Sequence, residues 1–229
     1  MEKHMSIVST EFGVIATHEN DLIGKILNRD LIWEPHNIAL MRKYINEGDV
    51  VLDIGANIGF FSVVLSKIVG DGGKVHSFEP VLENFKLLEF NCSKLSNIVL
   101  HYYALGNQIG NVTLSSERGN MGNSYITNES FGDIKLMKLD DLAIEPNFIK
   151  LDVQGFEYDV LLGGLETIKY NRPVMIIELE DSNESIPTSF RKSKENSLQL
   201  LKELNYNVYN VISEYPVDYL CVPNELDNA

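Results

Sequence analysis

Short apolar runs alternate along the chain with stretches in which apolar residues recur three and four positions apart. Runs rich in β-branched residues are typical of buried strands, whereas i, i+3, i+4 spacing is typical of amphipathic helices. Five runs are predicted to be parallel strands, and they begin at Val50, Lys74, Ile98, Asn147 and Pro173. Helical spacing is found in residues 41–45, 61–68, 85–95, 160–168 and 198–204. This alternation predicts an α/β fold with a doubly wound parallel sheet.

The last part of the chain extends this pattern differently. Residues 207–212 and 217–222 are two short apolar stretches separated by a turn, and residues 134–139 form another strand-like run. Two neighbouring strands joined by a few turn residues favour an antiparallel hairpin. We therefore expect the sheet to end in a C-terminal hairpin.

The length of 229 residues suits a single α/β domain over residues 1–229. Residues 6–34 predict no regular element, so residues 1–35 are treated as an N-terminal segment. Residues 106–133 are rich in glycine and asparagine and form a long polar insertion. Such an insertion in a compact domain is usually functional or irregular. We expect either a lid over a bound substrate, including Met121–Ser124, or an ordinary flexible loop.

The turn after the first strand predicts a ligand site. It contains Asp53, Gly55, Ala56, Asn57 and Gly59, where a dinucleotide-binding turn has the pattern G-x-G-x-x-G. The first glycine relieves crowding at the turn, and the last lets the next helix pack closely on the strand. Asparagine at the second glycine position places a side chain where a pyrophosphate needs clearance. A ligand without phosphates, such as S-adenosylmethionine, suits this turn better.

The second strand ends on an acidic residue. Glu79 is followed by Pro80, which cannot continue the strand, and lies 79 − 53 = 26 residues after Asp53. Glu79 is placed to accept hydrogen bonds from the two hydroxyls of a ribose, at a somewhat longer offset than the usual ~20 residues. The alternative is a solvated charge at a strand end.

Together these segments resemble the FkbM-type methyltransferases. The resemblance rests on V-L-D-I-G-A-N-I-G-F-F-S, H-S-F-E-P-V-L-E-N-F, F-I-K-L-D-V-Q-G-F-E and I-I-E-L-E, between about Trp33 and Glu180. It implies a Rossmann-like class I methyltransferase fold with a mostly parallel seven-stranded sheet, S-adenosyl-L-methionine as cofactor, and O-methylation, often of a sugar or glycan hydroxyl. It also implies cofactor contacts from Trp33, Glu34, Asn84 and Ala104. Trp33 could equally anchor the N-terminal segment to the core.

Acidic residues near the ends of the fourth and fifth strands are candidates for catalysis. Asp152 and Glu178 are expected to bind either the acceptor hydroxyl or a magnesium ion, because carboxylate oxygens are ligands that Mg²⁺ prefers. Lys150, Gln154 and Glu157 would orient the acceptor or the loop. Alternatively, Lys150 is the partner that a carboxylate in an apolar strand requires, and Glu157 interacts with a helix dipole. Among the histidines, His36 is the one to test as a base.

Composition narrows the acceptor. The net charge of −14 opposes binding to nucleic acid, so a small molecule or a glycan is expected. Two cysteines, Cys92 and Cys221, are too few for a disulfide framework. No stretch is apolar enough to span a membrane and no signal pattern opens the chain, so a soluble, cytoplasmic protein is expected. Two alternatives stay open, a nicotinamide-dependent oxidoreductase and a non-catalytic cofactor-binding subunit.

Overall fold

The computed structural model describes residues 5–18, 21–116, 124–127, 132–179, 193–211 and 218–227. Its strands are β1 (Met5–Thr10), β2 (Gly13–His18), β3 (Val50–Ile54), β4 (Lys74–Phe78), β5 (Ile98–His101), β6 (Ala104–Leu105), β7 (Gly110–Ser116), β8 (Ser124–Thr127), β9 (Ile134–Met137), β10 (Phe148–Leu151), β11 (Val174–Glu178), β12 (Tyr206–Val211) and β13 (Asp218–Pro223). Its helices are α1 (Leu22–Asp30), α2 (Pro35–Tyr44), α3 (Phe60–Val69), α4 (Leu82–Cys92), α5 (Glu157–Gly163), α6 (Leu165–Asn171), α7 (Ser193–Glu203) and the 3₁₀ helix η1 (Leu139–Leu142).

The main sheet has seven strands in the order β12-β13-β11-β10-β3-β4-β5. β13 pairs antiparallel with both β11 and β12, and the other neighbouring strands pair in parallel. The expected mostly parallel sheet with a C-terminal antiparallel hairpin is therefore confirmed. From β3 the chain proceeds to β4 and β5 on one side and then to β10 and β11 on the other. Ligands bind beyond the carboxyl ends of the strands at such a reversal.

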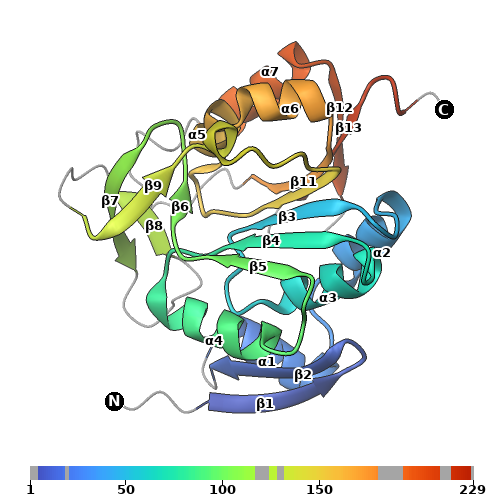
Figure 1. Cartoon of the computed structure of the whole chain (residues 1–229), viewed down its shortest axis with the longest axis vertical. Coiled ribbons are helices and arrows are strands. Elements are labelled where there is room, and N and C mark those ends of the chain that lie inside the picture. The colour runs from blue at the N-terminus through green and yellow to red at the C-terminus, as the bar shows by residue number, and fades with distance from the viewer. Residues whose placement is uncertain are drawn as a thin grey trace.

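Two apolar layers cover the two faces of this sheet. On one face, side chains of α1 to α4 and the β1–β2 hairpin pack against alternate residues of β3, β4, β10 and β11. On the other, α5 to α7 and the small sheet pack against the intervening residues. Figure 1 shows α5, α6 and α7 together at the top, the small sheet at the left, and α1, α3 and α4 near the hairpin at the bottom.

The N-terminal segment is more ordered than its sequence predicted. β1 and β2 pair antiparallel and α1 follows them, within residues for which no element was expected. Asn91 of α4 fastens this hairpin, because its Oδ1 accepts from Ala16 N at 2.7 Å and its Nδ2 donates to Ala16 O at 2.9 Å and Ile58 O at 2.7 Å. A hairpin held by a residue 75 positions away has no local sequence pattern to reveal it.

The polar insertion also differs from the expected irregular loop. β7 pairs antiparallel with β8 and with β9, and β6 pairs in parallel with β9, which gives a small sheet in the order β6-β9-β7-β8. Residues 117–123 and 128–131 lie outside the described residues, so the expected lid at Met121–Ser124 is described only at Ser124. Pairing with β9, which follows later in the chain, stabilises strands that alternate too briefly to be recognised locally.

A third difference is that two helices, α5 and α6, replace the single helix expected after β10. The break lies at Gly163 and Gly164. A Cβ on Gly163 would lie 1.8 Å from the backbone oxygen of Gly106, so the chain turns where it contacts the residue after β6.

Among the described residues, no helix is long and apolar enough to cross a membrane. Cys92 and Cys221 are free and buried, in agreement with a packing role.

Candidate active site

The face of the main sheet toward α3 carries polar side chains near the carboxyl ends of three strands. Asp53 of β3 lies opposite Ser77 of β4 and Lys150 of β10, so the three side chains point to the same face. Ser62 of α3 donates to Asp53 Oδ2 at 2.6 Å, and Ser77 donates to Ser62 at 2.8 Å. Asp53 is fully buried, and burial raises the pKa of its carboxyl group. Asp53 of this polar row lies just before the turn that was predicted to bind a ligand.

Lys150 is the cation of this row. Its side chain is 5% exposed, and its Nζ lies 3.2 Å from Asp152 Oδ2 and 4.8 Å from the ring centroid of Phe61. Burial by itself lowers the pKa of this ammonium group, but the carboxylates of Asp152 and Asp53 outweigh burial and raise it. The pairing of Lys150 with Asp152, one of the expected roles, is therefore present. A charged lysine is stable here because carboxylates surround it.

Gln154 joins the two carboxylates that were expected to act on the acceptor. Its Nε2 donates to Asp152 Oδ1 at 2.8 Å and to Glu178 Oε1 at 3.2 Å. Glu178 lies directly opposite Asp218 of β13, so two acidic side chains point to the same face side by side. Burial, and then the charge of Asp152, raise the pKa of Glu178 well above its ordinary value. Asp152, Glu178 and Asp218 thus form an acidic row along the carboxyl edge.

This arrangement does not fit a magnesium ion. Among the described residues, no group of three or more His, Cys, Asp and Glu side chains is placed to hold a metal. The Lys150 ammonium already contacts Asp152 Oδ2, and the Gln154 amide already lies between Asp152 and Glu178. A divalent cation at the same place would be repelled by that ammonium group.

The carboxylate of Glu157 is hydrogen-bonded to the loop that precedes it. Its Oε1 accepts from Gly155 N at 2.8 Å and from Val153 N at 3.3 Å, and its Oε2 accepts from the Ser193 hydroxyl at 3.3 Å. The side chain is buried, and burial raises its pKa to about 7. These contacts support a structural role, holding the turn that carries Gln154, over direct contact with an acceptor.

Three backbone N–H groups of the turn after β3 are already hydrogen-bonded within the protein. Gly55 N and Ala56 N donate to Phe78 O at 3.0 and 2.9 Å, and Asn57 N donates to Glu79 Oε2 at 2.8 Å. Asn57 adopts a left-handed conformation with φ of 50°. A dinucleotide-binding turn presents such N–H groups to phosphate oxygens. Here they are committed to the neighbouring strand, which agrees with the inference of a ligand without phosphates.

Glu79 is not the solvated strand-end charge considered as an alternative. Its side chain is buried, Oε1 accepts from Val81 N at 2.8 Å, and burial raises its pKa to about 7. Each carboxylate oxygen accepts one backbone hydrogen bond and has capacity for one more. That remaining capacity matches the two hydroxyls of a ribose. Pro80 follows β4, which ends at Phe78, as the sequence predicted.

The two glycines of the turn have left-handed backbone conformations and close neighbours. A Cβ on Gly55, which has φ of 85°, would lie 1.8 Å from the backbone oxygen of Asp152. Gly55 therefore allows contact between the turn and the end of β10. A Cβ on Gly59, which has φ of 87°, would lie 2.6 Å from Leu88 Cδ1. The close neighbour of Gly59 is thus α4, and not β3 as expected.

Three buried oxygen atoms beside this turn and edge have no hydrogen-bond partner in the described part of the chain. They are Oδ1 of Asn37, Asp53 and Asn57. Buried polar atoms are normally hydrogen-bonded, so such acceptors indicate places for the donors of a ligand. The amino group and ribose hydroxyls of S-adenosylmethionine are donors of this kind. The residues around the turn therefore fit that cofactor.

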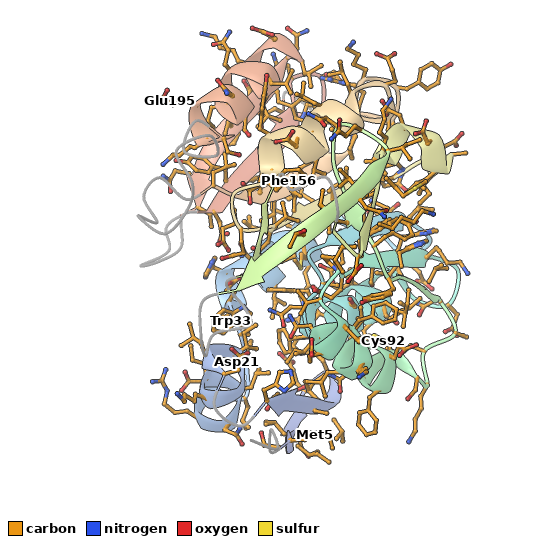
Figure 2. The ribbon with its side chains drawn as sticks, turned by 90° about the vertical axis from the view of Figure 1, so that its left-hand side faces the viewer. Met5, Asp21, Trp33, Cys92, Phe156 and Glu195 are labelled. Atoms are coloured by element: carbon orange, nitrogen blue, oxygen red, sulfur yellow. The ribbon has the colours of Figure 1, made fainter. Side chains whose placement is uncertain are left out.

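The segment before α2 lies close to the same edge. Trp33 packs against the first core layer, and Figure 2 shows it between Asp21, at the start of α1, and the body of the molecule. This position supports its anchoring role and leaves a cofactor contact untested. Glu34 has φ of 43°, and its Oε2 accepts from Asn37 Nδ2 at 2.8 Å. Burial raises the pKa of Glu34 to about 7.

Two other residues from the family resemblance lie near strand ends. Asn84 is buried in the first turn of α4, just after Glu79. Ala104 is buried in β6, where it pairs with Leu136 in the small sheet, so it follows β5 as expected but belongs to a separate sheet. The cofactor contacts of Asn84 and Ala104 stay predictions.

Sequence reasoning missed Asn37 and Asp218. Asn37 Nδ2 donates to Asp218 Oδ2 at 2.8 Å, and His36 Nε2 lies 3.1 Å from the same oxygen. Asp218 begins β13, which was predicted as a strand, but only its register with Glu178 brings it to this edge. The available clue in the sequence was an aspartate near the start of an apolar stretch predicted to be a strand.

Buried carboxyl groups give the protein a characteristic pH dependence. Burial raises the pKa of Glu34, Glu79 and Glu157 to about 7, whereas an unfolded glutamate has a pKa of about 4.3. Between these values the folded chain binds more protons than the unfolded chain. Stability present below about pH 4.3 is therefore lost as the pH rises through about 7. We expect Tm of the ligand-free protein to fall by roughly 5–10 °C from about pH 5 to about pH 8.

Circular dichroism melts across this range measure the effect. The variant Glu79→Gln removes one titrating group and should reduce the slope, while Glu166→Gln, at an exposed position of α6, should leave it unchanged. A Tm that rises with pH in this range would contradict the assigned burial of these carboxyl groups.

Comparison with known proteins identifies the family. The family model described as the Methyltransferase FkbM domain matches residues 53–208. Hexuronic acid methyltransferase AglP of Haloferax volcanii is 30% identical over 142 residues, which are 59% of this chain and 58% of that protein. The chain thus matches little more than half the length of this relative.

Solved structures agree in fold. The methyltransferase FkbM of Methylobacillus flagellatus superposes with a TM-score of 0.52 at 18% identity, over 77% of this chain and 44% of that one. Fibrillarin of Aeropyrum pernix in complex with S-adenosyl-L-methionine superposes with a TM-score of 0.52 at 13% identity, over 95% and 82% of the two chains. Both show the class I methyltransferase fold. Because the family match covers more than half of its 229 residues, this chain belongs to the FkbM methyltransferase family.

Proposed function

We propose that this protein is an S-adenosylmethionine-dependent O-methyltransferase that methylates a hydroxyl group of a sugar or glycan. The observation that carries the proposal is the contact between a cofactor half-site and an acceptor half-site at one edge of the sheet. The turn from Asp53 to Asn57 contacts the backbone of Asp152 through Gly55, and Asp152 is linked by Gln154 to Glu178. A cofactor held by the first half-site and an acceptor held by the second would therefore be neighbours.

The cofactor half-site uses acceptor atoms. Glu79 would hold the ribose hydroxyls with its free lone pairs, and Asp53 Oδ1 and Asn57 Oδ1 would accept from other donors of the cofactor. S-adenosylmethionine, when bound, supplies an electrophilic methyl group on a positively charged sulfur. The carboxylates of this edge favour such a cation.

The acceptor half-site positions an oxygen. Asp152 is about one quarter exposed, which leaves its carboxylate open to an acceptor hydroxyl while Lys150 and Gln154 fix its orientation. Burial raises the pKa of Glu178, which favours its protonated form, and in that form it can donate a hydrogen bond to a second sugar oxygen. Holding the oxygen in line with the methyl group supplies much of the rate acceleration in such reactions.

The charge of this half-site bears on the acceptor. Asp152, Glu178 and Asp218 face it, and Lys150 is already paired with Asp152. A hexuronic acid, the substrate in the name of AglP, carries a carboxylate at neutral pH. We therefore propose an uncharged sugar hydroxyl as the preferred acceptor here, and no nucleic acid, in keeping with the net charge of −14. We also propose that residues 1–229 act as one methyltransferase domain.

Calorimetric titration with S-adenosylhomocysteine tests the cofactor, and methyl transfer to simple glycosides tests the acceptor. We expect a Kd on the order of 1–10 μM and transfer to methyl β-glucoside, detected by mass spectrometry. Methyl β-glucuronide should react at least ~10-fold less efficiently, because its carboxylate is repelled. EDTA should leave both measurements unchanged, since the residues present do not fit magnesium.

Each alternative has its own outcome. Absence of S-adenosylhomocysteine binding with binding of NADH would favour an oxidoreductase and would reject the proposed cofactor. Binding without transfer to any glycoside would favour a non-catalytic subunit. Loss of transfer in EDTA, restored by magnesium, would reinstate a metal at Asp152 and Glu178.

A further inference from the structure

We propose that His36 is the general base that accepts the proton of the acceptor hydroxyl, and that Asp218 positions its imidazole ring. This inference rests on the proposed function and assigns a residue that the acidic row does not contain. His36 stands in the first turn of α2, and Asp218 begins β13, so two elements far apart in the sequence meet at this edge.

The contacts of the pair define which ring nitrogen is available. His36 Nε2 lies 3.1 Å from Asp218 Oδ2, and a carboxylate there selects the tautomer with the proton on Nε2. Nδ1 then has a free lone pair. Among the described residues, the His36 ring makes no other hydrogen bond, and its side chain is 31% exposed whereas that of Asp218 is 3% exposed. One ring nitrogen of His36 therefore contacts a buried carboxylate, and the other belongs to a partly exposed side chain.

Asp218 is itself held in place from a second direction. Asn37 Nδ2 donates to Asp218 Oδ2 at 2.8 Å and to Glu34 Oε2 at 2.8 Å. The carboxylate thus cannot rotate freely away from His36. A base oriented by a fixed carboxylate is the arrangement found in many histidine-dependent enzymes.

The separation between Asp152 and the His36–Asp218 pair matches the size of a sugar ring. Asp152 follows β10, Glu178 ends β11 and Asp218 begins β13, and these three strands are consecutive in the sheet. Neighbouring strands are about 4.8 Å apart, so Asp152 and Asp218 are separated by roughly 10 Å across the edge. One pyranose ring fits in that interval. Glu34, two residues before His36, interacts electrostatically with Lys150 and Asp152 as well as with Asp218, so the segment that carries His36 approaches the Asp152 end, where the cofactor turn lies.

The carboxyl groups at the edge are less suited to act as the base. Both oxygens of Asp152 already accept hydrogen bonds, from Lys150 and Gln154. Glu178 is buried, its Oε1 accepts from Gln154, and burial raises its pKa, which favours its protonated form. The acidic groups on the elements around His36 are Asp218, which contacts its ring, and Glu34 and Glu178, which lie beside Asp218.

The step balances in protons and electrons. The acceptor oxygen forms its bond to the methyl carbon as the carbon–sulfur bond breaks, and the electron pair of that bond stays on sulfur. The hydroxyl proton passes to His36 Nδ1. Because the ring is partly exposed, it returns this proton to solvent before the next turnover.

The test uses the full chain, S-adenosylmethionine and methyl β-glucoside. His36→Gln keeps an amide donor toward Asp218 but has no basic nitrogen. We expect kcat to fall about 10²-fold with S-adenosylhomocysteine affinity unchanged, and His36→Ala to be partly rescued by added imidazole. Asp218→Asn should lower kcat about 10-fold and weaken its dependence on pH. His76→Gln, at a half-buried position of β4, is the control and should retain full turnover.

A second readout needs no turnover. Nitrogen-15 spectra of labelled histidine should show His36 protonated on Nε2 above neutral pH, and a mixture of tautomers in Asp218→Asn. A wild-type His36 protonated on Nδ1, or full turnover in a folded His36→Gln variant, would overturn the assignment. Absence of methyl transfer by the wild-type protein would instead overturn the proposed function, and the role of His36 with it.

Discussion

Replacing Gly55 with alanine is expected to destabilise the protein by roughly 3–5 kcal/mol and to abolish measurable cofactor binding. The left-handed conformation at φ of 85° accounts for about 1–2 kcal/mol of this change. The remainder arises because the added Cβ would lie 1.8 Å from the backbone oxygen of Asp152, and neither backbone can move without separating β3 from β10. Chemical denaturation and calorimetry with S-adenosylhomocysteine measure the two effects.

Gly48 provides the matched control. It has φ of 93°, but a Cβ there would meet no heavy atom within 4 Å. Gly48→Ala should therefore show only the conformational effect, about 1–2 kcal/mol, with cofactor affinity retained. If the two variants lost equal stability, the contact between Gly55 and Asp152 would not hold the half-sites together.

Asp152→Asn is expected to lower kcat for methyl β-glucoside about 10³-fold while the protein remains folded. The substitution removes the charge that orients Lys150 and the acceptor, and small displacements of an acceptor oxygen are costly in a reaction that depends on alignment. Tm should also fall, because Lys150 is buried and loses its nearest counter-charge. Turnover and thermal melts separate these effects.

Asp141→Asn makes the same change of charge at an exposed position of η1 and should leave turnover intact. Binding of S-adenosylhomocysteine to Asp152→Asn should stay within about fivefold of the wild-type affinity, since the proposed cofactor contacts are those of Glu79 and the β3 turn. Intact turnover in a stably folded Asp152→Asn variant would remove Asp152 from the acceptor half-site.

Local patterns were sufficient for the central strands and for the residues at their ends. Each run is bounded by a turn or a proline, and side chains alternate strictly along a strand. Once β3 and β10 are recognised as parallel strands of one sheet, their carboxyl ends must share one edge, whereas the register that places Asp53 and Lys150 on one face is seen only in the pairing. The placement of Glu79, Asp152 and Glu178 at that edge follows from the same reasoning.

Contacts between distant segments were beyond such patterns. The β1–β2 hairpin depends on Asn91, and β7 depends on β9, so neither has a recognisable local signature. Glu157 was an acceptable catalytic candidate by position, but the loop around it turns its carboxylate toward Gly155 N. Only the folded chain decides which partner a carboxylate selects.

The sequence alone therefore determined the sheet, its ligand-binding edge and the acidic character of that edge, because these depend on periodicity and on where strands end. Tertiary structure decided which atoms stay available to a ligand. Register places Asp218 beside Glu178, and the approach of α2 brings His36 to Asp218. Phe78 O and the Glu79 carboxylate accept from three N–H groups of the β3 turn. Such choices depend on hydrogen-bond distances between segments that are far apart in the sequence.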